Sequence, residues 1–319
     1  MSSLAYALIV AICAPLLAFG WFIAANWAPD LALDELKARW AQPPSRFVEL
    51  DGMQVHLRDE GPRDDPLPIV LLHGTSSSLH TWDGWARELS RKRRVIHFDL
   101  PGIGLTGPAP DADYRIERDV RFVASALDRL GVARCALAGN LFGGQIAWET
   151  ALAHPERVEK LILVDAAGYP LQPLAVPLGF RLARMPLLNR LAQHLLSRHV
   201  IESSLRSVYG DPNKVTPELV ERYYQLTLRA GNRRALVQRF AQSIEGIHPE
   251  RISGVRVPTL ILWGRRDRLL PPADAERLRR DIAGSRLVVF ERLGHVPQEE
   301  DPAATLAAAK RFLDGIAPT

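Results

Sequence analysis

The chain has 319 residues, of which 47% are hydrophobic and 24% are charged. This is ordinary globular composition, so it excludes a disordered, collagen-like or disulfide-stapled protein. The formal net charge of +4 is small and the basic residues form no long run, so no nucleic-acid partner is expected. Cys13 and Cys135 lie in separate apolar segments. Because the sequence has neither a dinucleotide fingerprint nor metal-ligand spacing, we expect no cofactor and no metal.

The N-terminal segment differs in character from the rest of the chain. Residues 4–27 are apolar, and no charged residue precedes Asp30. A helix of this length reaches across a hydrocarbon core of about 30 Å. A cleaved signal peptide is the alternative, but no Lys or Arg precedes the run and no suitable cleavage site follows it. The sequence therefore predicts a single-pass membrane anchor at residues 1–30, with the lipid bilayer as a partner.

The basic residues near this segment suggest an orientation for the anchor. Lys37, Arg39 and Arg46 follow the apolar run, and no Lys or Arg precedes it. Positive charge gathers on the cytoplasmic side of membrane helices. The large domain is therefore predicted to lie in the cytoplasm.

From residue 47 onward, predicted strands alternate with predicted helices. Residues 47–50 and 53–61, joined by Asp51-Gly52, indicate a β-hairpin. Further strands are expected at 69–72, 94–99, 134–139, 161–166, 258–264 and 285–291, and helices at 79–89, 116–130, 142–153 and 302–313. Such alternation predicts an α/β fold whose mostly parallel sheet is covered by helices on both faces. We expect this core to comprise residues 47–169 and 258–315.

The segment between the two parts of the core is predicted to be helical. Residues 170–257 show only helical spacings and helix breakers, and they carry 13 Lys/Arg against 6 Asp/Glu, a net charge of +7. We expect a helical cap over the carboxyl edge of the sheet. Its positive charge indicates either a solvated face or a surface that rests against an anionic membrane leaflet.

Short motifs follow the predicted strands at their carboxyl ends. In chain order they are His73-Gly74, Asp99-Leu100-Pro101-Gly102, Gly139-Asn140-Leu141-Phe142-Gly143-Gly144, Asp267 within WGRRDRLLPP, and His295 within RLGHVPQEEDP. Together, and in these positions, they resemble the α/β-hydrolase fold family in its cap-bearing branch. The resemblance extends over nearly all of residues 47–313. It implies a catalytic triad in the order nucleophile, acid and histidine, at position 141, Asp267 and His295.

The resemblance also implies roles for the neighbouring residues. The backbone N–H groups of Phe142 and Thr75 are expected to form the oxyanion hole. His73, Gly74, Trp82 and Asn140 are expected to line the substrate site. For His73, bracing of the loop is an alternative, and for Trp82 a place in the core is another.

The position of the nucleophile is occupied by an aliphatic side chain. Relatives carry Ser, Asp or Cys there, whereas Leu141 has no lone pair and no acidic proton, so it cannot form a covalent intermediate. Three interpretations stay open: a degenerate hydrolase that only binds, a serine hydrolase lacking only its nucleophile, or general-base catalysis by the remaining His–Asp pair. Asp165 is an alternative acid.

The expected substrate is small and hydrophobic. An apolar cap favours a carboxylic ester, a thioester or a lactone. The elbow is also similar to that of carbon–carbon bond hydrolases of aromatic degradation, which gives an alternative activity. A non-catalytic protein that binds an apolar ligand or partner at the membrane is the rival from another class.

Overall fold

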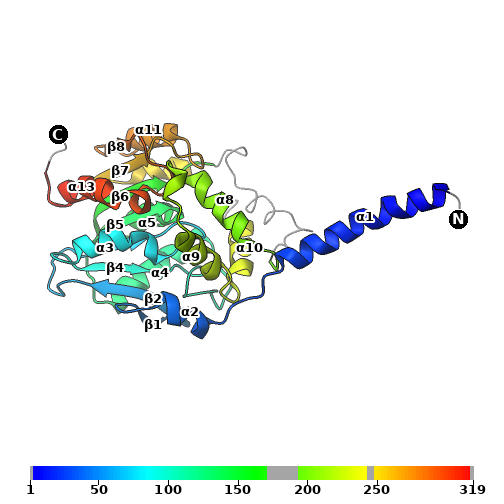
Figure 1. Cartoon of the computed structure of the whole chain (residues 1–319). Coiled ribbons are helices and arrows are strands. Elements are labelled where there is room, and N and C mark those ends of the chain that lie inside the picture. Colours follow the sequence, from blue (N-terminus) through cyan, green and yellow to red (C-terminus); the bar gives the residue numbers. More distant parts are fainter. Residues whose placement is uncertain (1–2, 171–192, 243–247, 317–319) are drawn as a thin grey trace.

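The computed structural model describes residues 3–170, 193–242 and 248–316 (Figure 1). An eight-stranded sheet runs through the body in the order β1-β2-β4-β3-β5-β6-β7-β8. The strands are β1 Arg46–Leu50, β2 Met53–Glu60, β3 Ile69–Leu72, β4 Val95–Phe98, β5 Cys135–Leu141, β6 Val158–Ala166, β7 Thr259–Gly264 and β8 Arg286–Phe290. From β4 to β8 all neighbours are parallel, while β2 pairs antiparallel with both β1 and β4. The predicted α/β fold is confirmed.

The expected hairpin forms the antiparallel edge of the sheet. Leu50 pairs with Met53, so the turn consists of two residues. Asp51 and Gly52 have φ values of 51° and 73°, as a tight hairpin turn between right-twisted strands requires.

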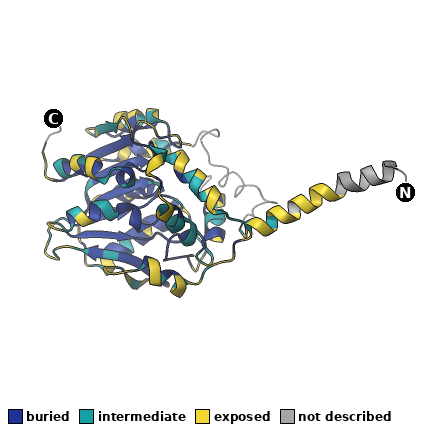
Figure 2. Cartoon of the chain, in the orientation of Figure 1, coloured by how far each residue is buried: buried dark blue, intermediate teal, exposed yellow. Residues whose placement is uncertain are grey.

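Two apolar layers lie on opposite faces of the sheet, because alternate residues of each buried strand point to opposite sides. Val70 and Leu72 pack with α4 (Ile116–Arg129), α5 (Phe142–Ala153) and α11 (Pro272–Asp281). Ile69 and Leu71 pack with α3 (Asp83–Leu89) and α13 (Pro302–Leu313). Figure 2 shows the strands buried between these helices. Such a doubly covered sheet holds the loops at its carboxyl edge on a rigid base.

Three helices of the predicted cap lie against loops at that edge. They are α8 (Arg198–Val208), α9 (Pro217–Thr227) and α10 (Asn232–Gln242). Tyr223 contacts the loop after β3, Arg239 the loop after β4, and Gly210 the loop after β8. Two parts of the predicted cap, 171–192 and 243–247, lie outside the described residues. The boundaries of the cap and its contact with anionic lipid stay predictions.

The N-terminal helix extends away from the body, and here the sequence-based localisation fails. Helix α1 covers Ser3–Asn26 and points into solvent (Figure 1). Leu17 and Trp21 are each 74% exposed (Figure 2). Within the part of the chain that the structure describes, no helix has the length and hydropathy of a membrane span. The prediction of a single-pass membrane protein with a cytoplasmic domain is therefore wrong.

The segment after α1 is attached to the cap helices. The Leu31 N–H donates to the Leu228 carbonyl at 2.7 Å, and the Ala230 N–H donates to the Leu31 carbonyl at 2.9 Å. Helix α2 (Leu33–Trp40) follows, and the Trp40 indole donates to Gln225 on α9 at 2.7 Å. The sequence shows this stretch only as polar. Its order comes from contacts with residues almost 200 positions away.

A buried carboxyl group on α5 predicts a pH-dependent stability. Glu149 is 2% exposed, and one of its oxygens has no partner among the described residues while the other pairs with Arg251 at 2.8 Å. Burial raises the pKa of Glu149 to about 7, even with the opposing charge of Arg251. The folded chain therefore retains a proton that the unfolded chain loses, and stability falls as the pH rises from the ordinary carboxyl pKa towards 7.

We expect Glu149→Gln to remove this loss. Chemical denaturation gives the unfolding free energy of the variant minus that of wild type at each pH. This difference should be larger at pH 8 than at pH 5 by on the order of 1 kcal/mol. The matched control is Glu156→Gln, because the Glu156 side chain is 66% exposed. An equal effect of Glu149→Gln at the two pH values would contradict the argument.

Candidate active site

The turn between β5 and α5 places Leu141 at its tip. Leu141 has φ 50° and ψ −114°, a conformation that non-glycine residues rarely adopt. A Cβ atom on Gly139 would lie 2.1 Å from the Gly143 carbonyl oxygen, and one on Gly143 would lie 2.4 Å from the Leu72 carbonyl oxygen. Because only glycine fits at both positions, strand and helix approach closely and the bend is fixed at residue 141.

The Leu141 side chain lies against the loop that follows β3. A Cβ atom on Gly74 would be 3.1 Å from the Leu141 Cβ atom. Leu141 is partly buried and packs against the larger apolar cluster. The tight strand-to-helix turn is therefore formed in the backbone, and an aliphatic side chain occupies its tip.

A His–Asp pair approaches the same edge from the loops after β7 and β8. His295 Nδ1 lies 2.7 Å from Asp267 Oδ2, and both side chains are buried. Asp267 Oδ1 accepts hydrogen bonds from the N–H groups of Leu269 and Leu270, at 2.7 and 2.9 Å. The carboxylate therefore acts only as an acceptor, and His295 carries its proton on Nδ1. Its Nε2 atom is buried without a hydrogen-bond partner among the described residues. An imidazole held this way is ready to accept a proton.

Asp165, the alternative acid, lies beside this pair at the end of β6. Its Oδ1 accepts the Gly264 N–H at 3.0 Å, and its carboxyl group lies within 4.8 Å of the ligand atoms of Asp267 and His295. Burial and the neighbouring Asp267 carboxylate raise the pKa of Asp165 well above its ordinary value. A carboxyl group that retains its proton is a poor orienting acid. The geometry favours Asp267 as the partner of His295.

Asn140 connects the elbow to the histidine loop. Its side-chain amide donates to the Val164 carbonyl at 3.0 Å and to the His295 carbonyl at 3.1 Å. The residue is 1% exposed. The sequence places Asn140 among the substrate-binding residues, and that assignment stays a prediction. The structure gives it a bracing contact that no spacing in the sequence reveals.

Asn140→Asp is expected to lower the unfolding free energy by about 2–4 kcal/mol, because a second acceptor would face two buried carbonyl oxygens. Chemical denaturation measures the loss. Asn213→Asp, at an exposed position, is the matched control and should have almost no effect. A loss for Asn140→Asp no larger than that of the control would contradict this role.

The two predicted oxyanion donors belong to different segments, the start of α5 and the loop after β3. Phe142 is the first residue of α5, so its N–H has no partner within the helix. Thr75 follows Gly74 in the loop after β3. The guanidinium of Arg239, from α10, lies 4.5 Å from the centre of the Phe142 ring. The role of the Thr75 and Phe142 N–H groups as an oxyanion hole stays a prediction.

Two of the other expected substrate contacts lie in the interior. His73 Nε2 accepts the Leu100 N–H at 3.0 Å, so its Nδ1–H donates to the Gly74 carbonyl at 2.8 Å. Burial lowers the pKa of His73, consistent with a neutral ring that braces the loop. Trp82 is fully buried and its ring centroid lies 5.1 Å from that of Trp85. A direct substrate contact of His73 or Trp82 stays a prediction.

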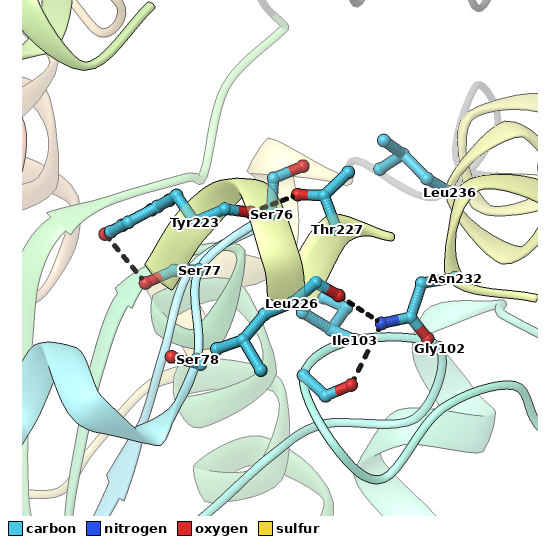
Figure 3. Close-up of a pocket in the computed structure, with 11 residues that line it drawn as sticks. Ser76, Ser77, Ser78, Gly102, Ile103, Tyr223, Leu226, Thr227, Asn232 and Leu236 are labelled. Atoms are coloured by element: carbon cyan, nitrogen blue, oxygen red, sulfur yellow. Dashed lines mark hydrogen bonds between the residues drawn. The ribbon is translucent and has the colours of Figure 1, made fainter. Parts of the chain in front are cut away.

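A pocket lies between the cap helices and the loops of the core (Figure 3). Ser76–Ser78 and Gly102–Gly104 form its core side. Tyr223, Leu226, Thr227, Asn232 and Leu236 line its cap side. Tyr223 donates to Glu299 at 2.8 Å, so it accepts the Ser77 hydroxyl at 3.1 Å. The sequence gives no signal for Tyr223, because its role depends on the folded cap.

Comparisons with known proteins assign the chain to a family. The family model described as alpha/beta hydrolase fold matches residues 68–302. The chain belongs to the α/β-hydrolase fold family.

Three known proteins are similar to this chain over most of its length. The 2-hydroxy-6-oxo-2,4-heptadienoate hydrolase of Pseudomonas putida is 31% identical over 281 residues, covering 84% of this chain and 95% of the relative. The crystal structure of a bacterial membrane phospholipase A superimposes with a TM-score of 0.74 at 28% identity, covering 98% of this chain and 97% of that one. A meta-cleavage product hydrolase from Pseudomonas fluorescens gives a TM-score of 0.73 at 25% identity, covering 85% of this chain and 97% of that one.

Proposed function

We propose that this chain has a serine-hydrolase site that lacks only its nucleophile. The site binds a small apolar carbonyl compound, and its ancestral reaction is hydrolysis of a carboxylic ester. With Leu141 at the elbow, the present chain binds such compounds and turns them over poorly. Two features support this proposal most strongly. Residue 141 lies at a strained turn, and the buried His295–Asp267 pair leaves His295 Nε2 without a partner among the described residues.

The retained scaffold argues for a recently active site. A leucine at φ 50° gains nothing from that conformation, and holding it costs of order 1–3 kcal/mol. Serine in the same conformation would project its hydroxyl into the site. The persistence of the strain, together with the glycines that permit it, supports descent from a catalytic elbow.

The reaction of a serine at residue 141 follows from the arrangement. His295 Nε2 takes the hydroxyl proton as the oxygen attacks the ester carbonyl, and Asp267 keeps the ring oriented through Nδ1. The N–H groups of Thr75 and Phe142 receive the developing oxyanion. His295 then protonates the leaving alcohol, and a water molecule activated by the same ring releases the acid.

The similar proteins are of two kinds, a phospholipase and carbon–carbon bond hydrolases, and each kind supports a different class of substrate. The membrane phospholipase A, similar along almost the whole chain, supports an ester with an apolar acyl group. The heptadienoate hydrolase, similar over 84% of the chain, supports a second candidate function, hydrolysis of a carbon–carbon bond next to a ketone.

The test is a substrate comparison on the Leu141→Ser variant. p-Nitrophenyl esters of increasing acyl length represent the first function, and 2-hydroxy-6-oxo-2,4-heptadienoate represents the second. Turnover of esters with a preference for longer acyl chains supports the first, and turnover of the dienoate alone supports the second. No turnover of either class by a correctly folded variant would refute the proposal.

A further inference from the structure

A Ser–His–Asp chain lies outside the elbow, at the antiparallel edge of the sheet. His56 Nε2 is 2.9 Å from the Ser45 hydroxyl oxygen, and His56 Nδ1 is 2.7 Å from Asp99 Oδ2. Ser45 precedes β1, His56 lies in β2, and Asp99 follows β4. None of these residues belongs to the elbow or to the His295–Asp267 pair.

The direction of each hydrogen bond in this group is determined by the donors around Asp99. Asp99 Oδ1 accepts the Leu79 N–H and Oδ2 accepts the Leu105 N–H, at 2.8 and 2.7 Å. Because both oxygens of Asp99 accept backbone N–H groups, His56 donates to Asp99 through Nδ1. In the neutral ring, the free Nε2 atom then accepts the Ser45 hydroxyl proton.

A cation completes the arrangement around the hydroxyl. Arg58 Nε donates to the Ser45 oxygen at 3.0 Å, and Arg58 Nη1 is held by Asp83 at 2.8 Å. A guanidinium at this distance favours negative charge on the serine oxygen. The His56 ring is fully buried and stacks on Phe47 with ring centroids 5.1 Å apart. Ser45 itself is only partly buried.

We propose that Ser45 is a second nucleophilic site of this chain, activated by His56 and Asp99 and assisted by Arg58. The site takes acyl or phosphonyl groups from small activated esters and fluorophosphonates. The Ser45 oxygen attacks the carbonyl carbon or the phosphorus atom, and His56 Nε2 receives its proton. The bond to the leaving group breaks, and p-nitrophenolate or fluoride departs with its electron pair. The proton on His56 then passes to solvent.

Leu141 makes the test direct, because the wild-type elbow has no hydroxyl to label. The full wild-type chain is incubated with a fluorophosphonate, and the modified residues are identified by peptide mass spectrometry over time. We expect Ser45 to be labelled on the order of 10²-fold faster than Ser207, an exposed serine that donates only to the Ser204 carbonyl. Ser45→Ala should remove this adduct and leave the others unchanged.

A second variant tests the role of the imidazole. His56→Asn should slow the labelling of Ser45 to the rate of Ser207, with circular dichroism confirming that the variant is folded. If that variant does not fold, the proposal is tested by the ratio of the Ser45 and Ser207 labelling rates in wild type. Labelling of Ser45 no faster than Ser207 would overturn the proposal. This result does not depend on the Leu141→Ser experiment, so the two proposals fail separately.

Discussion

Leu141→Ser is expected to raise the turnover of an apolar p-nitrophenyl ester by at least about 10³-fold over wild type. The physical reason is that the proposed mechanism adds only a hydroxyl to features that the structure already has: the bend at the start of α5 and the His295–Asp267 pair at 2.7 Å. What Leu141 lacks is an atom that can share electrons with the carbonyl carbon. The comparison is made by steady-state kinetics at equal enzyme concentration.

The controls distinguish the effect of adding a hydroxyl from the effect of removing side-chain volume at residue 141. Leu141→Ala also empties space at the elbow but supplies no hydroxyl, so it should stay at the wild-type rate. His295→Gln in the Leu141→Ser background should return the rate to within about tenfold of wild type. Both should be made in a Ser45→Ala background, so that the second serine contributes nothing. An equal gain for Ala and Ser would contradict the account.

Arg239→Ala is expected to lower the unfolding free energy by about 3–5 kcal/mol. Arg239 is 2% exposed on α10, and it donates to Asp119 Oδ2 on α4 at 2.5 Å and to the Pro101 carbonyl at 2.7 Å. Removing the guanidinium would leave the Asp119 carboxylate buried without its counter-charge. Burial already raises the pKa of Asp119 in the presence of Arg239. The measurement is chemical denaturation at neutral pH.

The matched control is another cap arginine in an exposed pair. The Arg198 side chain is 59% exposed and pairs with Glu221 at 2.6 Å. Because solvent screens that pair, Arg198→Ala should cost at most about 1 kcal/mol. Similar losses for the two variants would show that the Arg239–Asp119 pair does not connect the cap to the core as described. The Arg239 variant should also weaken the activity gained by Leu141→Ser, since Arg239 packs over the ring of Phe142.

The sequence predicted the framework because local patterns determine it. Continuous apolar strands indicated the parallel sheet, and Asp51-Gly52 indicated the hairpin. The glycines around residue 141 located the elbow, since only residues without a side chain permit the contact between β5 and α5. Asp267 and His295 were placed by their positions after strands, and the structure brings them together.

Other features depend on contacts between distant segments, which no local pattern reports. Tyr223 reaches Ser77 across 146 residues, and Asn140 reaches the His295 carbonyl across 155. The Ser45–His56–Asp99 group joins residues before β1, within β2 and after β4. The predicted localisation is wrong for a different reason: the N-terminal run is apolar, yet no helix among the described residues has the length and hydropathy of a membrane span.

The central claim is that residue 141 is a catalytic position that lacks only its hydroxyl. The most direct measurement is the site and stoichiometry of fluorophosphonate labelling in the Ser45→Ala, Leu141→Ser double variant, read by peptide mass spectrometry. The account predicts one adduct per chain, on the serine introduced at position 141, and its loss when His295→Gln is added. A folded double variant that takes up no label at this position would contradict it.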